Sequence, residues 1–251
     1  MENNIYPPLF LVGEALAESY IEKIEALGFK IILMPSDVRL PLPTKSHTDM
    51  LLFSINENIF CNKVYFENNK RLFEKIEEYG YNIISCDFEV KDSYPFDVSL
   101  NQAQIGKYIL GNRKACAKEI LAYATENAYE YISIKQGYAK CSTLILNKKA
   151  IITADDNIEK SAKELNIEVL KISNGANEIK LDGYDYGFIG GASAVYEKTV
   201  FFFGDISLHK DGNEISNFCE KHGFSIISLS QYQLEDIGGA FILPYLKNLK
   251  N

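Results

Sequence analysis

One structural unit recurs about every 45 residues along this chain: a hairpin-like stretch, an amphipathic helical segment and a short apolar strand. The hairpin-like stretches begin at His47, Asp97, Gln136, Tyr186 and Asp236, and four of them break near Asn56, Gly106, Lys148 and Glu197. Polar residues and Gly at such breaks are typical of tight turns between paired strands. A repeat with its elements in a fixed order therefore predicts an α/β fold of five similar units.

A helical pattern follows each of the first four hairpin-like stretches, because apolar residues recur there three and four positions apart. These segments are 71–80, 114–126, 158–166 and 214–223. Each is followed by a buried-looking strand, at 82–88, 131–135, 168–173 and 225–230. Gly80 and Gly223 stand where such helices commonly end. The unit is thus written ββαβ.

The fifth unit has no room for its helix at the C-terminus, and the N-terminus supplies one. Residues 8–35 read strand, helix, strand with no hairpin before them. We expect this segment to close a ring with the C-terminal hairpin, because closed rings remove exposed sheet edges. The prediction is a single domain over residues 1–251.

Composition restricts the class of protein and its partners. The chain has 251 residues, 47% of them hydrophobic, and a net charge of -8, which disfavours nucleic acid as the main partner. No apolar run approaches the roughly 20 residues that span a membrane, and the start lacks a basic leader, so the expected location is the cytoplasm. Five scattered cysteines without CxxC spacing indicate reduced thiols rather than disulfides or a zinc site.

Several motifs give the sequence a resemblance to a known superfamily. HTDM, KQGYAKCS, GFIGGAS and ISLSQYQLEDIGG occur in this order within the five units. The chain resembles a DUF6873-like bacterial branch of the pentein superfamily, the fivefold pseudosymmetric α/β propellers that include the guanidino-group modifying enzymes. This resemblance covers nearly the whole chain, whereas the likeness to the catalytic branches is confined to short motifs. It implies no metal or organic cofactor.

The chemistry of catalytic penteins requires a nucleophile for the guanidinium carbon, a proton carrier and acids that hold the cation. Cysteine, histidine and Asp or Glu suit these three roles. Where the family places its late nucleophile this chain has Leu243. Read as a ring, however, the order acid with Gly-Gly, then HxD, then Cys is retained.

The resemblance, taken in cyclic order, assigns roles to individual residues. Cys141 would be the nucleophile and His47 the general acid/base, while Asp49 and Asp236 would hold the guanidinium or amidinium group. Lys135 and Gln136 lie next to the GYAKC turn, where Lys135 would lower the pKa of the thiol or hold a substrate carboxylate. Asn101, in the second unit, would add polar contacts.

Each of these residues also has a purely structural interpretation. Cys141 begins the stretch CSTLIL and would serve equally as a buried strand residue. Asp49 and Asp236 would close turns, and Lys135 would simply end a strand. Gly190 and Gly191 would allow close backbone approach where hairpins converge. The 16 Tyr and 15 Phe are spread through every unit, which indicates core filling rather than an aromatic ligand cage.

Two classes of function therefore stay open. The first is a cysteine-dependent hydrolase, deiminase-like, or an amidinotransferase acting on a small guanidine or amidine. The second is a non-catalytic pentein that binds a protein or senses a small molecule. The sequence specifies neither the substrate nor the oligomeric state.

Overall fold

The computed structural model describes residues 6–175 and 177–246. Within this part of the chain the strands form five three-stranded sheets and one two-stranded pair. The three-stranded sheets are β3 (Leu52–Ile55), β4 (Asn58–Asn62) and β5 (Asn82–Cys86); β6 (Ala103–Ile105), β7 (Tyr108–Gly111) and β8 (Glu130–Ser133); β9 (Thr143–Asn147), β10 (Ala150–Thr153) and β11 (Glu168–Lys171); β13 (Ser193–Tyr196), β14 (Thr199–Phe202) and β15 (Ser225–Ser228); and β17 (Phe241–Leu243), β1 (Leu9–Gly13) and β2 (Lys30–Met34). The pair is β12 (Ile179–Lys180) and β16 (Leu234–Glu235).

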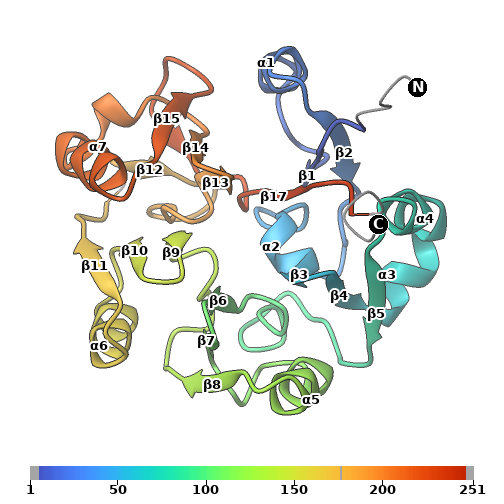
Figure 1. Ribbon diagram of the computed structural model, residues 1–251. Coiled ribbons are helices and arrows are strands. Elements are labelled where there is room, and N and C mark those ends of the chain that lie inside the picture. Colours follow the sequence, from blue (N-terminus) through green and yellow to red (C-terminus); the bar gives the residue numbers. More distant parts are fainter. Residues whose placement is uncertain (1–5, 176, 247–251) are drawn as a thin grey trace.

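All five three-stranded sheets share one topology. The first two strands pair antiparallel, and the third pairs parallel with the second. A parallel pair needs a crossover, and a helix supplies it in each unit. In Figure 1 the first strands lie nearest the centre of the molecule and the crossover helices at its periphery. The mixed α/β fold predicted from the repeat is confirmed.

Each unit has one crossover helix, and some units contain additional short helical segments. The crossover helices are α1 (Glu18–Ala26), α4 (Lys70–Glu77), α5 (Lys118–Glu126), α6 (Asp156–Glu164) and α7 (Gly212–Lys221). Shorter helical segments are α2 (Thr48–Leu51), α3 (Lys63–Asn68) and the 3₁₀ turn Ile206–Leu208.

The tight hairpin turns fall at the positions that the sequence indicates. Asn56, Gly106 and Glu197 have φ of 51°, 60° and 51°, the left-handed conformation of two-residue hairpin loops. Gly80 and Gly223 also have positive φ, 97° and 75°, just after α4 and α7.

Strand β17 pairs antiparallel with β1, with Leu9 opposite Leu243. β1 pairs in turn with β2 in parallel. The first and last strands of the described chain therefore lie in one sheet. The antiparallel pair β17 and β1 corresponds to the hairpin of each of the other four units.

Two details differ from the predicted helices. The helix expected from residue 114 begins at Lys118 instead, because the Asn112 side chain accepts the backbone N–H of Lys114 in a turn and Ala117 N–H donates to Ser99 O. The first hairpin-like stretch also contains the helices α2 and α3. α3 begins there because the Asn62 side chain accepts the N–H groups of Val64 and Tyr65.

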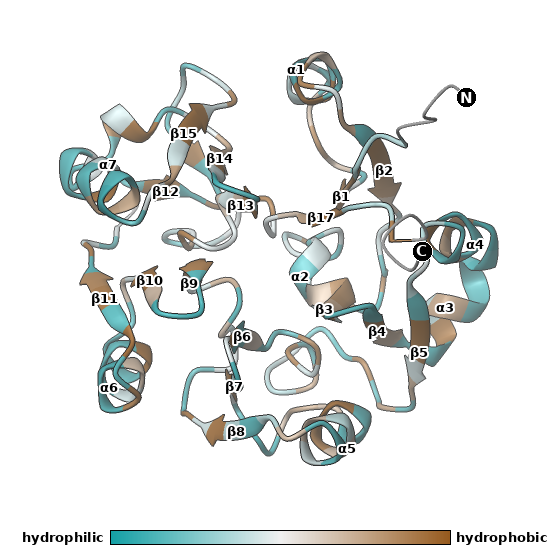
Figure 2. Ribbon diagram, in the orientation of Figure 1, coloured by the Kyte–Doolittle hydropathy of each residue, from teal (hydrophilic) through white to brown (hydrophobic). Residues whose placement is uncertain are grey.

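Aromatic and aliphatic side chains fill the space between neighbouring sheets. Phe10 of β1 contacts Phe201 and Phe203 edge to face, with ring centroids 6.3 Å apart in both cases. Figure 2 shows hydrophobic strands and hydrophilic residues on the peripheral helices. No helix within residues 6–175 and 177–246 combines the length and the apolar character needed to cross a membrane.

Candidate active site

A cavity of about 230 Å³ brings together residues from four separate parts of the chain. His47 immediately precedes α2, Met50 lies within it, and Cys141 precedes β9. Asp236 follows β16. The lining is Thr44, His47, Met50, Tyr138, Cys141, Leu181, Tyr184, Asp185, Tyr186, Phe188 and Asp236.

The Cys141 thiol is held by two polar side chains. Its Sγ donates to Asp49 Oδ2 at 2.9 Å and accepts from Asn101 Nδ2 at 2.9 Å. Cys141 is 3% exposed and Asp49 only 1%, so this contact is almost closed to solvent. Asp49 therefore does not form the side-chain turn that its position allows; it contacts a residue 92 positions away.

Asn101 fixes the backbone that carries the thiol. Its Oδ1 accepts the N–H groups of Lys140 and Cys141 at 2.8 and 3.1 Å, and its Nδ2 also donates to Asp49 O at 3.1 Å. Asn101 is fully buried, so a change to an apolar residue would leave these groups without a partner. One amide thus joins the segments of Asp49 and Cys141.

The side chains of His47 and Asp236 lie close together in the cavity wall. His47 Nδ1 lies 3.8 Å from Asp236 Oδ1. Asp236 Oδ1 accepts Gly238 N–H at 2.9 Å and Oδ2 accepts Phe188 N–H at 2.8 Å. The structural role of Asp236 in a turn is therefore real, and the same carboxylate is also next to His47.

The Gly-Gly pair of the fourth unit permits close approach of backbones, as its sequence suggests. A Cβ added to Gly190 would lie 2.3 Å from Lys140 O and 2.7 Å from Cys141 O. A Cβ added to Gly191 would lie 1.9 Å from Asp236 Oδ1. Only glycine fits at these positions, and both contact the segments that carry candidate site residues.

Burial dominates the electrostatics of the site. It raises the pKa of Asp49 to about 7 and raises that of Asp236, although the positive charge of Lys140 opposes both shifts. Burial and the nearby Asp49 and Asp236 raise the pKa of the Cys141 thiol well above its usual value. Burial also lowers the pKa of His47, against the attraction of Asp236. The thiol and the imidazole are therefore both neutral near pH 7.

Asp49→Asn is expected to change how stability depends on pH. The unfolded Asp49 ionises near 3.8 and the folded one near 7, so the unfolded state binds fewer protons between these values and wild-type stability falls as pH rises through that window. Relative to Asp49→Asn, the wild type should lose up to about 4 kcal/mol over this window, at about 1.4 kcal/mol per pH unit. Denaturant unfolding from pH 4 to 8 measures this difference.

The exposed Asp182→Asn serves as the control and should follow the wild-type curve. Burial lowers the pKa of His47, which makes stability rise with pH, but this effect is the same in all the proteins compared. Parallel wild-type and Asp49→Asn curves would contradict a neutral, buried Asp49.

Four of the assigned residues do not line the cavity: Asp49 and Asn101, which hydrogen-bond to the Cys141 thiol from behind, and Lys135 and Gln136. Lys135 is exposed and is not part of the lining. Gln136 donates to Asp155 Oδ2 at 2.9 Å and accepts Tyr138 N–H at 3.0 Å, so its amide holds the turn before Cys141.

Sequence reasoning missed two parts of the site. Lys140, whose charge lowers the pKa of both acids, was read only as part of a motif. The interpretation of the aromatic residues as core filling is wrong for Tyr184 and Tyr186, which are 48% and 40% exposed and line the cavity. The local run YDYGF was the available signal.

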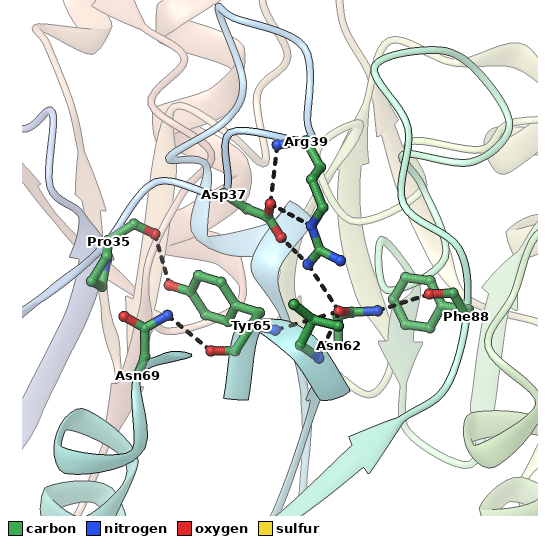
Figure 3. A network of polar contacts seen from close by, with 8 residues as sticks. Pro35, Asp37, Arg39, Asn62, Tyr65, Asn69 and Phe88 are labelled. Carbon is green, nitrogen blue, oxygen red and sulfur yellow. Dashed lines mark hydrogen bonds and ion pairs between the residues drawn. The ribbon is translucent and has the colours of Figure 1, made fainter. Parts of the chain in front are cut away.

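The loop that leads to His47 is fastened by the network in Figure 3. Arg39 donates to Asp37 Oδ1 and Oδ2 at 2.9 and 2.6 Å, and to Asn62 Oδ1 at 2.9 Å. Tyr65 OH donates to Pro35 O at 2.8 Å. Because Asn62 also caps α3, the segment before His47 is tied to the edge of the first unit.

In residues 6–175 and 177–246, no group of three or more His, Cys, Asp and Glu side chains is arranged to hold a metal ion.

Solved structures share this arrangement of elements. DDAH from Pseudomonas aeruginosa, as a mutant complexed with citrulline, has a TM-score of 0.56 at 10% identity, over 95% of this chain and 99% of that chain. Inosamine-phosphate amidinotransferase from Streptomyces griseus has a TM-score of 0.56 at 13% identity, over 96% and 94%. Agmatine deiminase of C. jejuni has a TM-score of 0.55 at 9% identity, over 90% and 88%.

These similarities establish the class of fold, which is that of the penteins. Residues 11–241 match the family described as "Family of unknown function (DUF6873)", and the chain belongs to that family. No curated protein matches the sequence.

Proposed function

We propose that this protein is a cysteine-dependent hydrolase or amidinotransferase that acts on a small guanidine or amidine. Cys141 is the nucleophile, His47 the general acid/base, and Asp49 and Asp236 hold the cation. The observation that carries the proposal is that Cys141, His47 and Asp236 line one cavity, with Asp49 bonded to the thiol. The fivefold propeller and a cytoplasmic location, which five free buried cysteines favour, belong to the same proposal.

The proposed reaction begins with attack of Cys141 Sγ on the central carbon of the amidinium group. The thiol proton passes to His47, which then protonates the departing amine as the C–N bond breaks. Water attacks the resulting amidino-thioester in a hydrolase, and an acceptor amine attacks it in a transferase. Either nucleophile gives up a proton to His47 and releases the thiol.

Binding of a cationic substrate would favour ionisation of the Cys141 thiol, which is otherwise neutral. Burial and two carboxyl groups raise the pKa of the thiol and keep it neutral. An amidinium cation beside Asp236 and the thiol, with Asp49 behind the thiol, supplies a positive charge, which favours ionisation of both acids and of the thiol. Asn101 Nδ2, which already donates to Sγ, would stabilise the thiolate. The nucleophile would therefore be activated only when the cavity is filled.

Lys135 and Gln136 are not among the proposed substrate contacts. Neither residue lines the cavity, and Gln136 is hydrogen-bonded to Asp155. Asn101 enters as the residue that positions the thiol.

One observation favours the alternative function, a pocket that binds a cation without reacting with it. The Cys141 thiol is buried and donates to a carboxylate, and neutral thiols are poor nucleophiles.

A panel of guanidines and amidines separates the two functions. Ammonia or amine release is followed for wild type and Cys141→Ala, together with mass spectrometry of rapidly quenched wild type. Turnover that depends on Cys141, with a covalent adduct on that residue, supports the enzyme. Saturable binding of panel members without any release or adduct would instead establish the binding module.

Lys140→Met is expected to shift the pH dependence of turnover. The Lys140 charge lowers the pKa of Asp49 and Asp236, so its loss raises both and delays their ionisation. The acid limb of kcat/KM should move upward by about 1 pH unit. Lys140→Arg keeps the charge and should leave the limb in place. An unshifted limb in Lys140→Met would show that these acids do not control turnover.

A further inference from the structure

The lining of the cavity, all of which lies in the described part of the chain, contains carboxyl groups and no Lys or Arg. Asp236 lines it, Asp49 lies behind Cys141, and the exposed Asp185 lines its mouth. A ligand that enters meets carboxyl groups at both ends of the cavity.

Of the lysines close in sequence to lining residues, Lys135 is exposed and outside the lining, and three others are turned to other partners. Lys140 donates to Gly190 O at 3.4 Å and lines a separate cavity. Lys180 pairs with Asp182 at 3.0 Å, and Lys45 acts on the Glu14 carboxyl group. A carboxylate on the ligand would thus lose its hydration without gaining a cation, and it would face like charge.

The wall between the acids is aromatic and aliphatic. Tyr138 stacks on Phe188 with centroids 6.3 Å apart and planes at 26°, and Tyr186 meets Phe188 edge to face at 5.9 Å. Leu181 and the half-exposed Tyr184 also line the cavity. Ring faces attract cations and bury methylene groups, so the wall suits an alkyl chain or a positive group. At about 230 Å³ the cavity is smaller than the sites of drug-sized ligands.

We infer that this site selects cationic guanidines or amidines that carry no carboxylate, with an apolar or ammonium-bearing tail toward Asp185. This inference rests on the function proposed above and specifies its substrate class. Decarboxylated guanidines such as agmatine belong to the selected class, whereas α-amino acids such as arginine do not. Asp185 is the specificity-determining residue at the mouth.

Binding to Cys141→Ser tests the inference separately from turnover, because the substitution removes the nucleophile while it keeps a hydroxyl group at that position. Calorimetric titration compares agmatine with arginine, which differ only in the carboxylate, and includes butylguanidine, which lacks both the carboxylate and the ammonium group. We expect agmatine and butylguanidine to bind at least about 10-fold more tightly than arginine. Selective binding supports the inference even where the wild type releases no ammonia, a result that would overturn only the proposed reaction.

Arginine that binds as tightly as agmatine overturns the inference, and so does failure of all three to bind at millimolar concentration. Turnover of arginine by the wild type would then still uphold the proposed reaction.

Asp185→Lys in the same background should reduce the preference for agmatine over arginine by about 10-fold, because it places a cation where a carboxylate would lie. The matched control Asp182→Asn lies on the same loop, outside the lining, and should keep the wild-type preference. A preference unchanged in Asp185→Lys contradicts the role of Asp185 and overturns the inference.

Discussion

Cys141→Ala is expected to abolish turnover of the guanidine or amidine substrate, with kcat/KM reduced by at least about 10⁴-fold. No other lining residue of the cavity is a cysteine, so no second thiol is placed to form the covalent intermediate. The measurement is product release under substrate saturation and at low substrate concentration, so that kcat and KM are separated.

The same substitution should preserve binding of the cation. Asp49 and Asp236, the two acids proposed to hold the cation, remain. The thiol itself adds no negative charge to the site, because burial and both acids oppose its ionisation. Cys219→Ala is the matched control, since Cys219 is also a free, buried cysteine but lies in a different core cluster. It should cost about 1 kcal/mol of stability and leave turnover intact. Wild-type rates in Cys141→Ala would end the assignment of the nucleophile.

Gly238→Ala is expected to destabilise the protein by about 3 kcal/mol or more and to displace the candidate site. Gly238 has φ of 79°, and an added Cβ would lie 2.3 Å from His47 Cβ. Its N–H donates to Asp236 Oδ1 and its carbonyl accepts Asp49 N–H at 3.2 Å. A clash at this glycine therefore moves His47, Asp49 and Asp236 together.

Gly28→Ala separates backbone strain from the clash. Gly28 has φ of 90°, but nothing lies within 4 Å of an added Cβ. It should cost about 1–2 kcal/mol, the strain of an alanine in the left-handed region. Thermal and urea unfolding measure both variants. Equal losses for the two substitutions would mean that the contact between Gly238 and His47 is not a constraint on the fold.

The repeat is predictable from the sequence because the turns and helix ends of each unit depend on local backbone preferences. Asn56, Gly106 and Glu197 break the apolar alternation where the hairpins turn, and Gly80 and Gly223 follow the helices. The periods of strand and helix do not depend on distant contacts. The late start of α5 was not predictable, because it depends on a bond from Ala117 N–H to Ser99 O.

Part of the site was predictable from the sequence and part was not. Cys141, His47, Asp49 and Asp236 were singled out by a resemblance and by cyclic order; Cys141, His47 and Asp236 line one cavity, whereas Asp49 lies behind Cys141 and accepts a hydrogen bond from its thiol. The exposed aromatic wall was not predicted, because composition cannot tell a Tyr that fills a core from one that lines a cavity. Lys140 was missed for a related reason: its effect on Asp49 depends on a distance that the sequence does not contain.

The sequence by itself determined the unit, its turns and the kinds of residue available for chemistry, since these follow from local backbone preference and side-chain type. Only the tertiary structure decided which of them meet. The Cys141 thiol contacts an acid 92 positions away and an amide 40 positions away. Packing the inner ends of several units together buries these groups, and that burial, which no local pattern encodes, sets their pKa values.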